Sequence, residues 1–155
     1  MKLVEVFGVR VEMPGNQPIV LLREVSGDRY LPIWVGSAEA SAISLAQQGI
    51  EAARPLTIDL LIKLLDQTNT VLQQIEVSQL VDGIFYADLV FEDDTRISAR
   101  PSDAIALALK LNIPIFSAES VLNQAGITIA EEPDSEAELE KFREFLDQIN
   151  PEDFS

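Results

Sequence analysis

Two Arg-Pro pairs stand in front of predicted helices, and an aspartate follows each pair within a few residues. Arg54 and Pro55 precede Asp59, and Arg100 and Pro101 precede Asp103. Proline pushes the preceding residue into an extended conformation, so each arginine is held in a restricted direction just before a helix begins. Helix N-termini favour anions through their free backbone amides and the helix dipole. Each pair could therefore hold a phosphate through its arginine, or a cation through its aspartate.

Glu39, in the first turn of a third predicted helix, belongs to the same potential cluster of charges. Taken alone, an acid at this position most often compensates the helix dipole. The structural alternative for the whole cluster is that the arginines pair with the aspartates, including crosswise between the two halves of the chain. Both alternatives are open from the sequence.

The amino-acid inventory removes much of the usual catalytic repertoire. The chain has 155 residues, without a cysteine or a histidine. This excludes disulfides, thiolate metal sites, imidazole ligands and imidazole general bases. Serine or cysteine triads, zinc hydrolase sites and the paired-histidine ribonuclease mechanism all lack their central residue. Carboxylates, arginines, lysines, hydroxyls, the two tyrosines and any metal held by carboxylates remain.

The chain is strongly acidic, with a formal net charge of -15. Residues 131 to 155 contain ten acidic and two basic residues, so the rest of the charge lies before this tail. Such a chain repels a phosphate backbone, so RNA or DNA binding would need a local basic patch or bridging divalent cations.

The start of the chain does not resemble a targeting segment. Glu5 and Glu12 interrupt what would be the apolar stretch of a signal peptide, and no run approaches the length of a membrane span. We expect a soluble, cytoplasmic protein with no membrane partner.

The elements that must position these side chains occur twice. Residues 19 to 50 are predicted to form strand, turn, strand and helix, and residues 85 to 115 repeat that order. A hairpin-plus-helix unit cannot bury its own apolar face, so two copies packed together make a sensible domain. We predict an α+β fold of duplicated hairpin-plus-helix units, with a mostly antiparallel sheet packed with helices, plus a C-terminal helix.

Turn residues and apolar periodicity set the boundaries of the expected elements. Strands are expected over residues 2–12, 19–25, 29–35, the later part of 71–80, 84–92, 96–100 and 113–116. Helices are expected from Ser37 up to Gly49, from Thr57 to Gln67, from Ser102 to Leu111 and over residues 118–125, with Thr57 and Ser102 as N-caps. The helix after Ser102 is apolar on all sides and should be buried.

The last residues differ in character from the rest. We predict one domain over residues 1–130, followed by an acidic linker and amphipathic helix over residues 131–155. Ser135 and Glu138 form a capping box at the start of this helix. Its apolar stripe could dock on its own domain or recruit a protein partner, and both alternatives are open.

Four blocks of sequence together resemble the bifunctional nuclease domain family. They are Ile33-Trp34-Val35-Gly36 with Glu39-Ala40 and Ala42-Ile43, then Arg54-Pro55-Leu56-Thr57 with Asp59-Leu60, then Phe85-Tyr86-Ala87-Asp88-Leu89, and finally Ala99 to Ala108. The match spans about residues 3 to 130, and the tail is similar to that of actinobacterial members. The resemblance implies an α+β domain that tends to form a homo-oligomer, and a nuclease activity on both RNA and DNA.

One block departs from the family pattern. Members typically carry Thr-His-Asp-Leu where this chain has Thr57, Ile58, Asp59 and Leu60. If that histidine is a proton shuttle or metal ligand, this protein has lost it. If it only packs beside the helix start, Ile58 is a tolerable replacement.

Two hypotheses follow from the residues and the resemblance. In the first, the protein is a nuclease in which Asp59, Asp103 and Glu39 hold a divalent cation, such as magnesium or manganese, that activates water. Arg54 and Arg100 then stabilise the charge on the phosphoryl oxygens.

In the second hypothesis, which the composition favours, the protein is a non-catalytic binding or regulatory oligomer. Its Arg-Asp pairs are structural, and its acidic tail helix meets a protein partner.

Overall fold

The computed structural model describes residues 1–12, 15 and 17–128. In chain order its elements are β1 (Lys2–Glu12), β2 (Gln17–Glu24), β3 (Arg29–Trp34), α1 (Ser37–Gln48), α2 (Thr57–Gln67), β4 (Leu72–Val81), β5 (Ile84–Phe91), β6 (Arg96–Ala99), α3 (Pro101–Leu111), β7 (Ile115–Ser117), α4 (Glu119–Ala125) and β8 (Ile127–Thr128).

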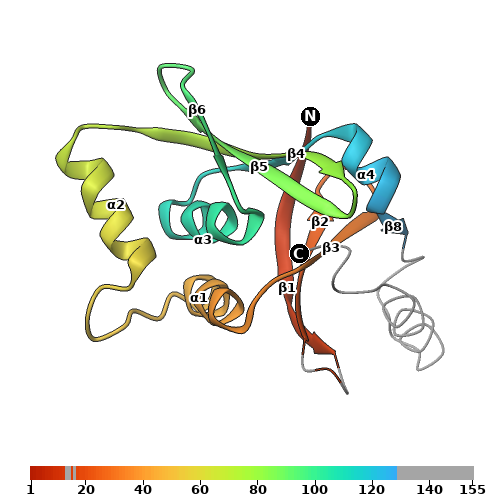
Figure 1. The fold of residues 1–155 in the computed structure, drawn as a ribbon, viewed down its shortest axis with the longest axis horizontal. Helices are drawn as coiled ribbons and strands as arrows, with labels where there is room; N and C mark the ends of the chain where they lie inside the picture. The colour runs from red at the N-terminus through yellow and green to blue at the C-terminus, as the bar shows by residue number, and fades with distance from the viewer. Residues whose placement is uncertain (13–14, 16, 129–155) are drawn as a thin grey trace.

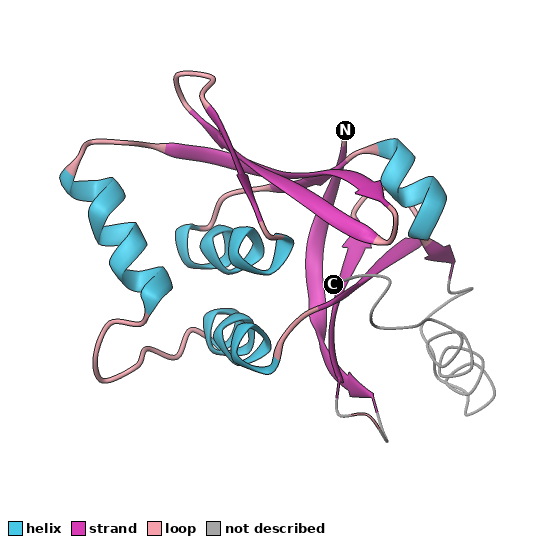
Figure 2. Cartoon of the chain, viewed as in Figure 1, coloured by secondary structure: helices cyan, strands magenta, loops and turns pink. Residues whose placement is uncertain are grey.

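The described strands form one sheet of eight, in the order β6-β5-β4-β7-β1-β2-β3-β8. All neighbouring strands run antiparallel except β4 and β7, which are parallel. Of the helices in the described residues, α1, α3 and α4 contact this sheet and α2 contacts α3 (Figures 1 and 2). The predicted α+β fold with a mostly antiparallel sheet is confirmed.

The duplication is visible in the strand pairing. A meander of β1, β2 and β3 leads into α1, and a meander of β4, β5 and β6 leads into α3. Each unit therefore contains one strand more than the predicted hairpin. Strand β7 joins the two meanders because it pairs with both β1 and β4. Helices α1 and α3 pack against each other, so the ends of the two units meet (Figure 1).

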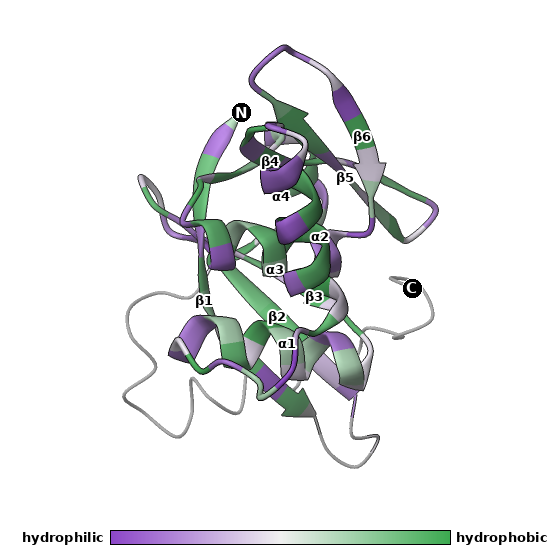
Figure 3. Cartoon of the chain, turned by 90° about the vertical axis from the view of Figure 1, so that its left-hand side faces the viewer, coloured by the Kyte–Doolittle hydropathy of each residue, from purple (hydrophilic) through white to green (hydrophobic). Residues whose placement is uncertain are grey.

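Helix α3 lies in the core, as its apolar sequence predicts. Its residues from Pro101 to Ala108 are buried except Asp103. Ala104 to Ala108 belong to one hydrophobic cluster with residues of the strands, including Val20 and Leu22 of β2. Figure 3 shows hydrophobic residues along both β2 and α3. A rigid buried helix therefore positions the Arg-Pro start that precedes it.

Both predicted N-caps are wrong by one or two residues. Helix α2 has Leu56 as its N-cap, and α3 has Arg100. Proline suits the first turn of a helix because its missing N–H needs no partner there, so α3 begins at Pro101 and Ser102 is buried inside it. At α2 the N–H of Leu56 donates to Asp59 Oδ2 at 2.9 Å. Leu56 has no side-chain acceptor for the reciprocal bond.

Smaller differences concern the ends of strands. Strand β2 begins earlier than expected, β7 occupies only Ile115–Ser117, and the short β8 was not predicted. Asn112 ends α3 in the left-handed conformation with φ 55°, so residues 113 and 114 lead out of the helix instead of forming strand.

The predicted tail helix and linker of residues 131–155 lie outside the described residues. Within the described part of the chain, no helix is long and apolar enough to cross a membrane.

Candidate functional site

Three helices begin around one depression of about 330 Å³, which we call the helix-start cleft. Its lining residues come from α1, α2 and α3 and are Ala38, Glu39, Ala42, Leu56, Thr57, Ile58, Arg100, Ser102, Asp103 and Ala106. The packing of α1 on α3 brings the N-termini of these two helices together, and the loop after α1 leads to the N-terminus of α2. Sequence positions about 60 residues apart thus share one surface hollow because the two units of the fold are packed end against end.

Arg100 is the cation of this cleft. Its Nε and Nη2 atoms donate to the Oδ2 and Oδ1 atoms of Asp103 at 2.9 and 3.2 Å, and Nη1 donates to Glu39 Oε1 at 3.2 Å. The hydrogen bonds from Arg100 to Asp103 raise the pKa of the guanidinium, with a smaller contribution from Glu39. The Arg100 side chain is still 65% exposed, so it is ion-paired but open to solvent.

Crosswise pairing between the two units does occur, through Glu39 instead of Asp59. Glu39 belongs to α1 of the first unit and Arg100 precedes α3 of the second. The structure thus brings together Arg100, Asp103 and Glu39, three of the five residues singled out from the sequence.

Asp59 lies apart from these three. Its Oδ1 atom accepts from Lys110 Nζ at 2.8 Å, and its Oδ2 atom accepts from the backbone N–H of Leu56. The hydrogen bond from Lys110, followed by that from Leu56, lowers the pKa of Asp59. Lys110 is seven residues after Asp103 in α3, which corresponds to about 10 Å along the helix axis. Asp59 therefore connects α2 to the far end of α3.

Arg54 also lies outside the helix-start cleft. It is exposed on the loop between α1 and α2 and lines a neighbouring depression of about 410 Å³ with Asp59, Ile62 and Lys63. Arg54 forms no ion pair with any residue that the structure describes. The sequence-based expectation that both Arg-Pro starts share one cleft is therefore met by Arg100 and not by Arg54.

The carboxylates do not assemble as a metal site. Among residues 1–12, 15 and 17–128, no three potential metal ligands gather. Glu39 and Asp103 both face Arg100, while Asp59 faces Lys110. Because each carboxylate already has a cation as its neighbour, this arrangement does not fit a divalent ion. The assignment of Glu39, Asp59 and Asp103 as metal ligands stays an untested prediction.

Sequence reasoning missed two kinds of participant. Thr57 and Ser102 line the cleft, although the sequence suggested only capping roles for them. Ser102 directly follows Arg100 and Pro101, and Thr57 lies two residues after Pro55, so their position close behind the Arg-Pro pairs was a usable signal. Lys110 gave no such signal, because a lysine in the last turn of a helix is explained by the helix dipole alone.

Comparison with known proteins places this geometry in a family. Residues 20–130 match the model of the bifunctional nuclease domain. The chain belongs to the bifunctional nuclease domain family. The matched range runs from β2 to just beyond the last described strand, so it contains every residue that lines the helix-start cleft.

Two relatives show the range of similarity within this family. The chain is 51% identical over 158 residues to "Uncharacterized protein Rv1829" of Mycobacterium tuberculosis (strain ATCC 25618 / H37Rv), with 97% of this chain and 96% of the relative covered. It is 22% identical over 128 residues to "Bifunctional nuclease 1" of Oryza sativa subsp. indica, with 79% of this chain covered. That alignment spans only 39% of the rice protein.

Proposed function

We propose that the protein is a nuclease that hydrolyses phosphodiester bonds in RNA and DNA at the helix-start cleft. The observation that carries this proposal is Arg100, an exposed cation held at the joint start of α1 and α3. Free amides at helix N-termini and a guanidinium are both suited to a phosphoryl group. Family membership and the name of the rice relative support the same activity.

In the proposed reaction, Arg100 stabilises the negative charge that develops on the phosphoryl oxygens. Asp103 holds the guanidinium through two hydrogen bonds and thereby fixes its direction. Glu39 is held by one hydrogen bond from Arg100, and its carboxylate accepts the proton of the attacking water. The bond from phosphorus to the leaving oxygen then breaks, and that oxygen takes a proton from solvent water. Arg54, in the neighbouring depression, contacts an adjacent phosphate of the same strand. Asp59 has a structural role at α2.

The test is hydrolysis of short single-stranded RNA and DNA, with and without magnesium or manganese. Arg100→Ala should lower the rate on the order of a hundredfold, as removal of one donor to a developing oxyanion does. Arg23→Ala is a matched control, because Arg23 is an ion-paired surface arginine of β2 outside the cleft. Equal rates for wild type, Arg100→Ala and Arg23→Ala would mean that a contaminant is responsible and that the proposal is wrong.

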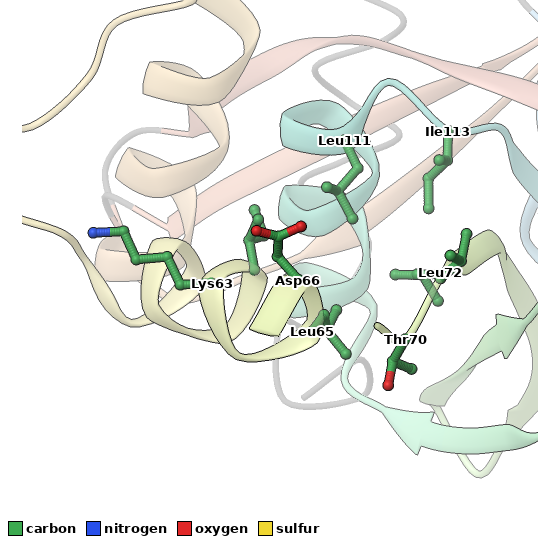
Figure 4. A pocket seen from close by; sticks show the side chains of 9 residues that line it. Lys63, Leu65, Asp66, Thr70, Leu72, Leu111 and Ile113 are labelled. Carbon is green, nitrogen blue, oxygen red and sulfur yellow. The ribbon is translucent and has the colours of Figure 1, made fainter. Parts of the chain in front are cut away.

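A second candidate function is a non-catalytic oligomeric binding protein, and a feature of α2 favours it. This helix buries none of its residues fully, and Leu60 and Leu64 on its outer face are 64% and 58% exposed. Leu56 continues the stripe at the same spacing. Beside it, a groove of about 400 Å³ runs between α2, α3 and β4. Leu65, Leu72, Leu111 and Ile113 line this groove, whereas the amine of Lys63 points away from it (Figure 4).

For this candidate the occupant of the α2 face is a second copy of the chain. Residues 51–71 contain three acidic and two basic residues, so this face is nearly neutral in a protein of net charge -15. Two copies can approach here with less repulsion than elsewhere. Leu60→Glu with Leu64→Glu should convert a dimer to a monomer in analytical ultracentrifugation. Val81→Glu, at an exposed apolar residue of β4, is the control. An unchanged mass for the double variant contradicts the assignment.

A further inference from the structure

The guanidinium of Arg100 donates hydrogen bonds to two carboxylates, those of Asp103 and Glu39. The edge made by Nε and Nη2 donates to both oxygens of Asp103, which belongs to the same helix start. The remaining nitrogen, Nη1, donates to one oxygen of Glu39. A guanidinium has five N–H donors, so these three bonds leave one donor on each Nη atom. Asp103 therefore holds Arg100 at two nitrogens, whereas Glu39 contacts it at one.

Glu39 lies where an anion would be bound. Its carboxylate folds back onto Gly36, the N-cap of α1, so closely that a Cβ atom on Gly36 would overlap Oε2. This position places a negative charge at the N-terminus of α1 and on the guanidinium of Arg100 at the same time. A carboxylate and a phosphoryl group present similar pairs of acceptor oxygens to a guanidinium.

We propose that Glu39 is an internal competitor for Arg100, whose carboxylate occupies the place of the ligand's phosphate group and is displaced when that phosphate binds. This inference rests on the proposed function, because it concerns the same cleft. Its consequence is that the affinity of the cleft for phosphate is set by the Glu39 to Arg100 contact. Displacement also leaves the Glu39 carboxylate beside the bound phosphate, where it serves as the base.

Two variants remove the competitor by different means. Glu39→Gln removes its charge and keeps its size. Gly36→Ala leaves Glu39 chemically intact but places a methyl group where its carboxylate now lies. Gly36 has φ -75° and ψ 163°, an extended conformation that alanine also adopts, so the steric effect on Glu39 is the main change. Gly8→Ala is the matched control, because a Cβ there meets only the flexible end of Arg10 at 3.6 Å.

The probe is inorganic phosphate, titrated while the side-chain Nε–H signal of Arg100 is followed by ¹⁵N NMR. We expect phosphate to shift this signal in wild type. In Glu39→Gln and in Gly36→Ala phosphate should bind about two- to fivefold more tightly, the gain expected from loss of one exposed ionic contact. Gly8→Ala should match wild type. With short single-stranded DNA as substrate, Glu39→Gln should also lower kcat while KM falls, a split that a structural role would not produce.

The outcomes separate this inference from the proposed function. If phosphate shifts the Arg100 signal equally in all four proteins, Glu39 does not compete and the inference is wrong, while the phosphate site stands. If phosphate shifts the signal in none of them, including Glu39→Gln, the cleft does not bind phosphate and the proposed function fails with it. If Gly36→Ala does not fold, the comparison of Glu39→Gln with wild type decides alone.

Discussion

Replacement of Asp59 should loosen α2 without changing the chemistry of the cleft. Helix α2 is attached to the domain through half-buried side chains, among them Ile62 and Leu65, and through the ion pair of Asp59 with Lys110. Asp59→Asn and Lys110→Met each remove one charge of this pair. An asparagine still accepts the N–H of Leu56, so Asp59→Asn mainly tests the ion pair.

The free energy lost with the ion pair of Asp59 and Lys110 can be estimated from the burial of the two side chains. The side chains of Asp59 and Lys110 are 21% and 19% exposed. Exposed pairs contribute about 0.2–1 kcal/mol, and removal of one partner from a fully buried pair costs about 3–5 kcal/mol. For this intermediate pair we expect each replacement to lower the free energy of α2 opening by about 1–2 kcal/mol. The double variant should show a coupling energy of about 1 kcal/mol.

Native-state hydrogen exchange measures this directly. Amides of Thr57–Gln67 should exchange roughly 5- to 30-fold faster in Asp59→Asn and Lys110→Met, because about 1.4 kcal/mol corresponds to a factor of ten. Amides of the buried helix α3 should keep their protection. Arg23→Ala, which breaks an exposed ion pair with Glu5, is the control and should leave α2 unchanged.

The decisive comparison is between the two halves of the pair. If Asp59→Asn abolishes cleavage while Lys110→Met cleaves normally, and both retain α2 protection, Asp59 takes part in the reaction. In that case the structural role given to it here is refuted. Equal, modest losses in both variants, together with faster α2 exchange, would agree with a purely structural role.

Further outcomes can be checked with single variants. The hydrogen bond from Arg29 is the largest cause of the lowered pKa of Glu24, a side chain only 6% exposed. The ion pair therefore contributes its full stabilisation above the pKa of Glu24 in the unfolded chain, near 4.5, and this contribution is lost as the pH falls through the lower pKa of the folded protein. In thermal melts, the decrease in Tm on acidification should be smaller for Arg29→Met than for wild type. In Gly126→Ala a Cβ would overlap the carbonyl oxygen of Leu122, so the Tm should fall by roughly 3–10 °C. Ile58→His should raise cleavage, because this residue lines the helix-start cleft; unchanged rates would show that it only packs there.

The sequence was sufficient to predict those helices and strands whose bounds are marked by nearby residues. The helix of Thr57–Gln67 was predicted to within one residue at its start, because its apolar spacing is helical and a polar residue stands before the apolar run. The buried state of α3 followed from a stretch with no polar face. The repeated order of strands and helix also predicted that two similar units would pack together, as they do.

Which residues line the helix-start cleft depends on contacts between residues that are far apart in the sequence. Arg54 and Arg100 both stand in an Ala-Arg-Pro sequence, yet only Arg100 lies in the helix-start cleft. The difference arises because α3 is buried against α1, whereas α2 lies outside this core and is tied to the far end of α3 through Lys110.

The sequence by itself thus determined most of the secondary structure, the duplication and the short list of charged residues, since these depend on neighbours along the chain. Only the tertiary structure decided which of those charges meet. Glu39 and Arg100 are 61 residues apart and were joined by the packing of two helices, a contact that no local pattern encodes.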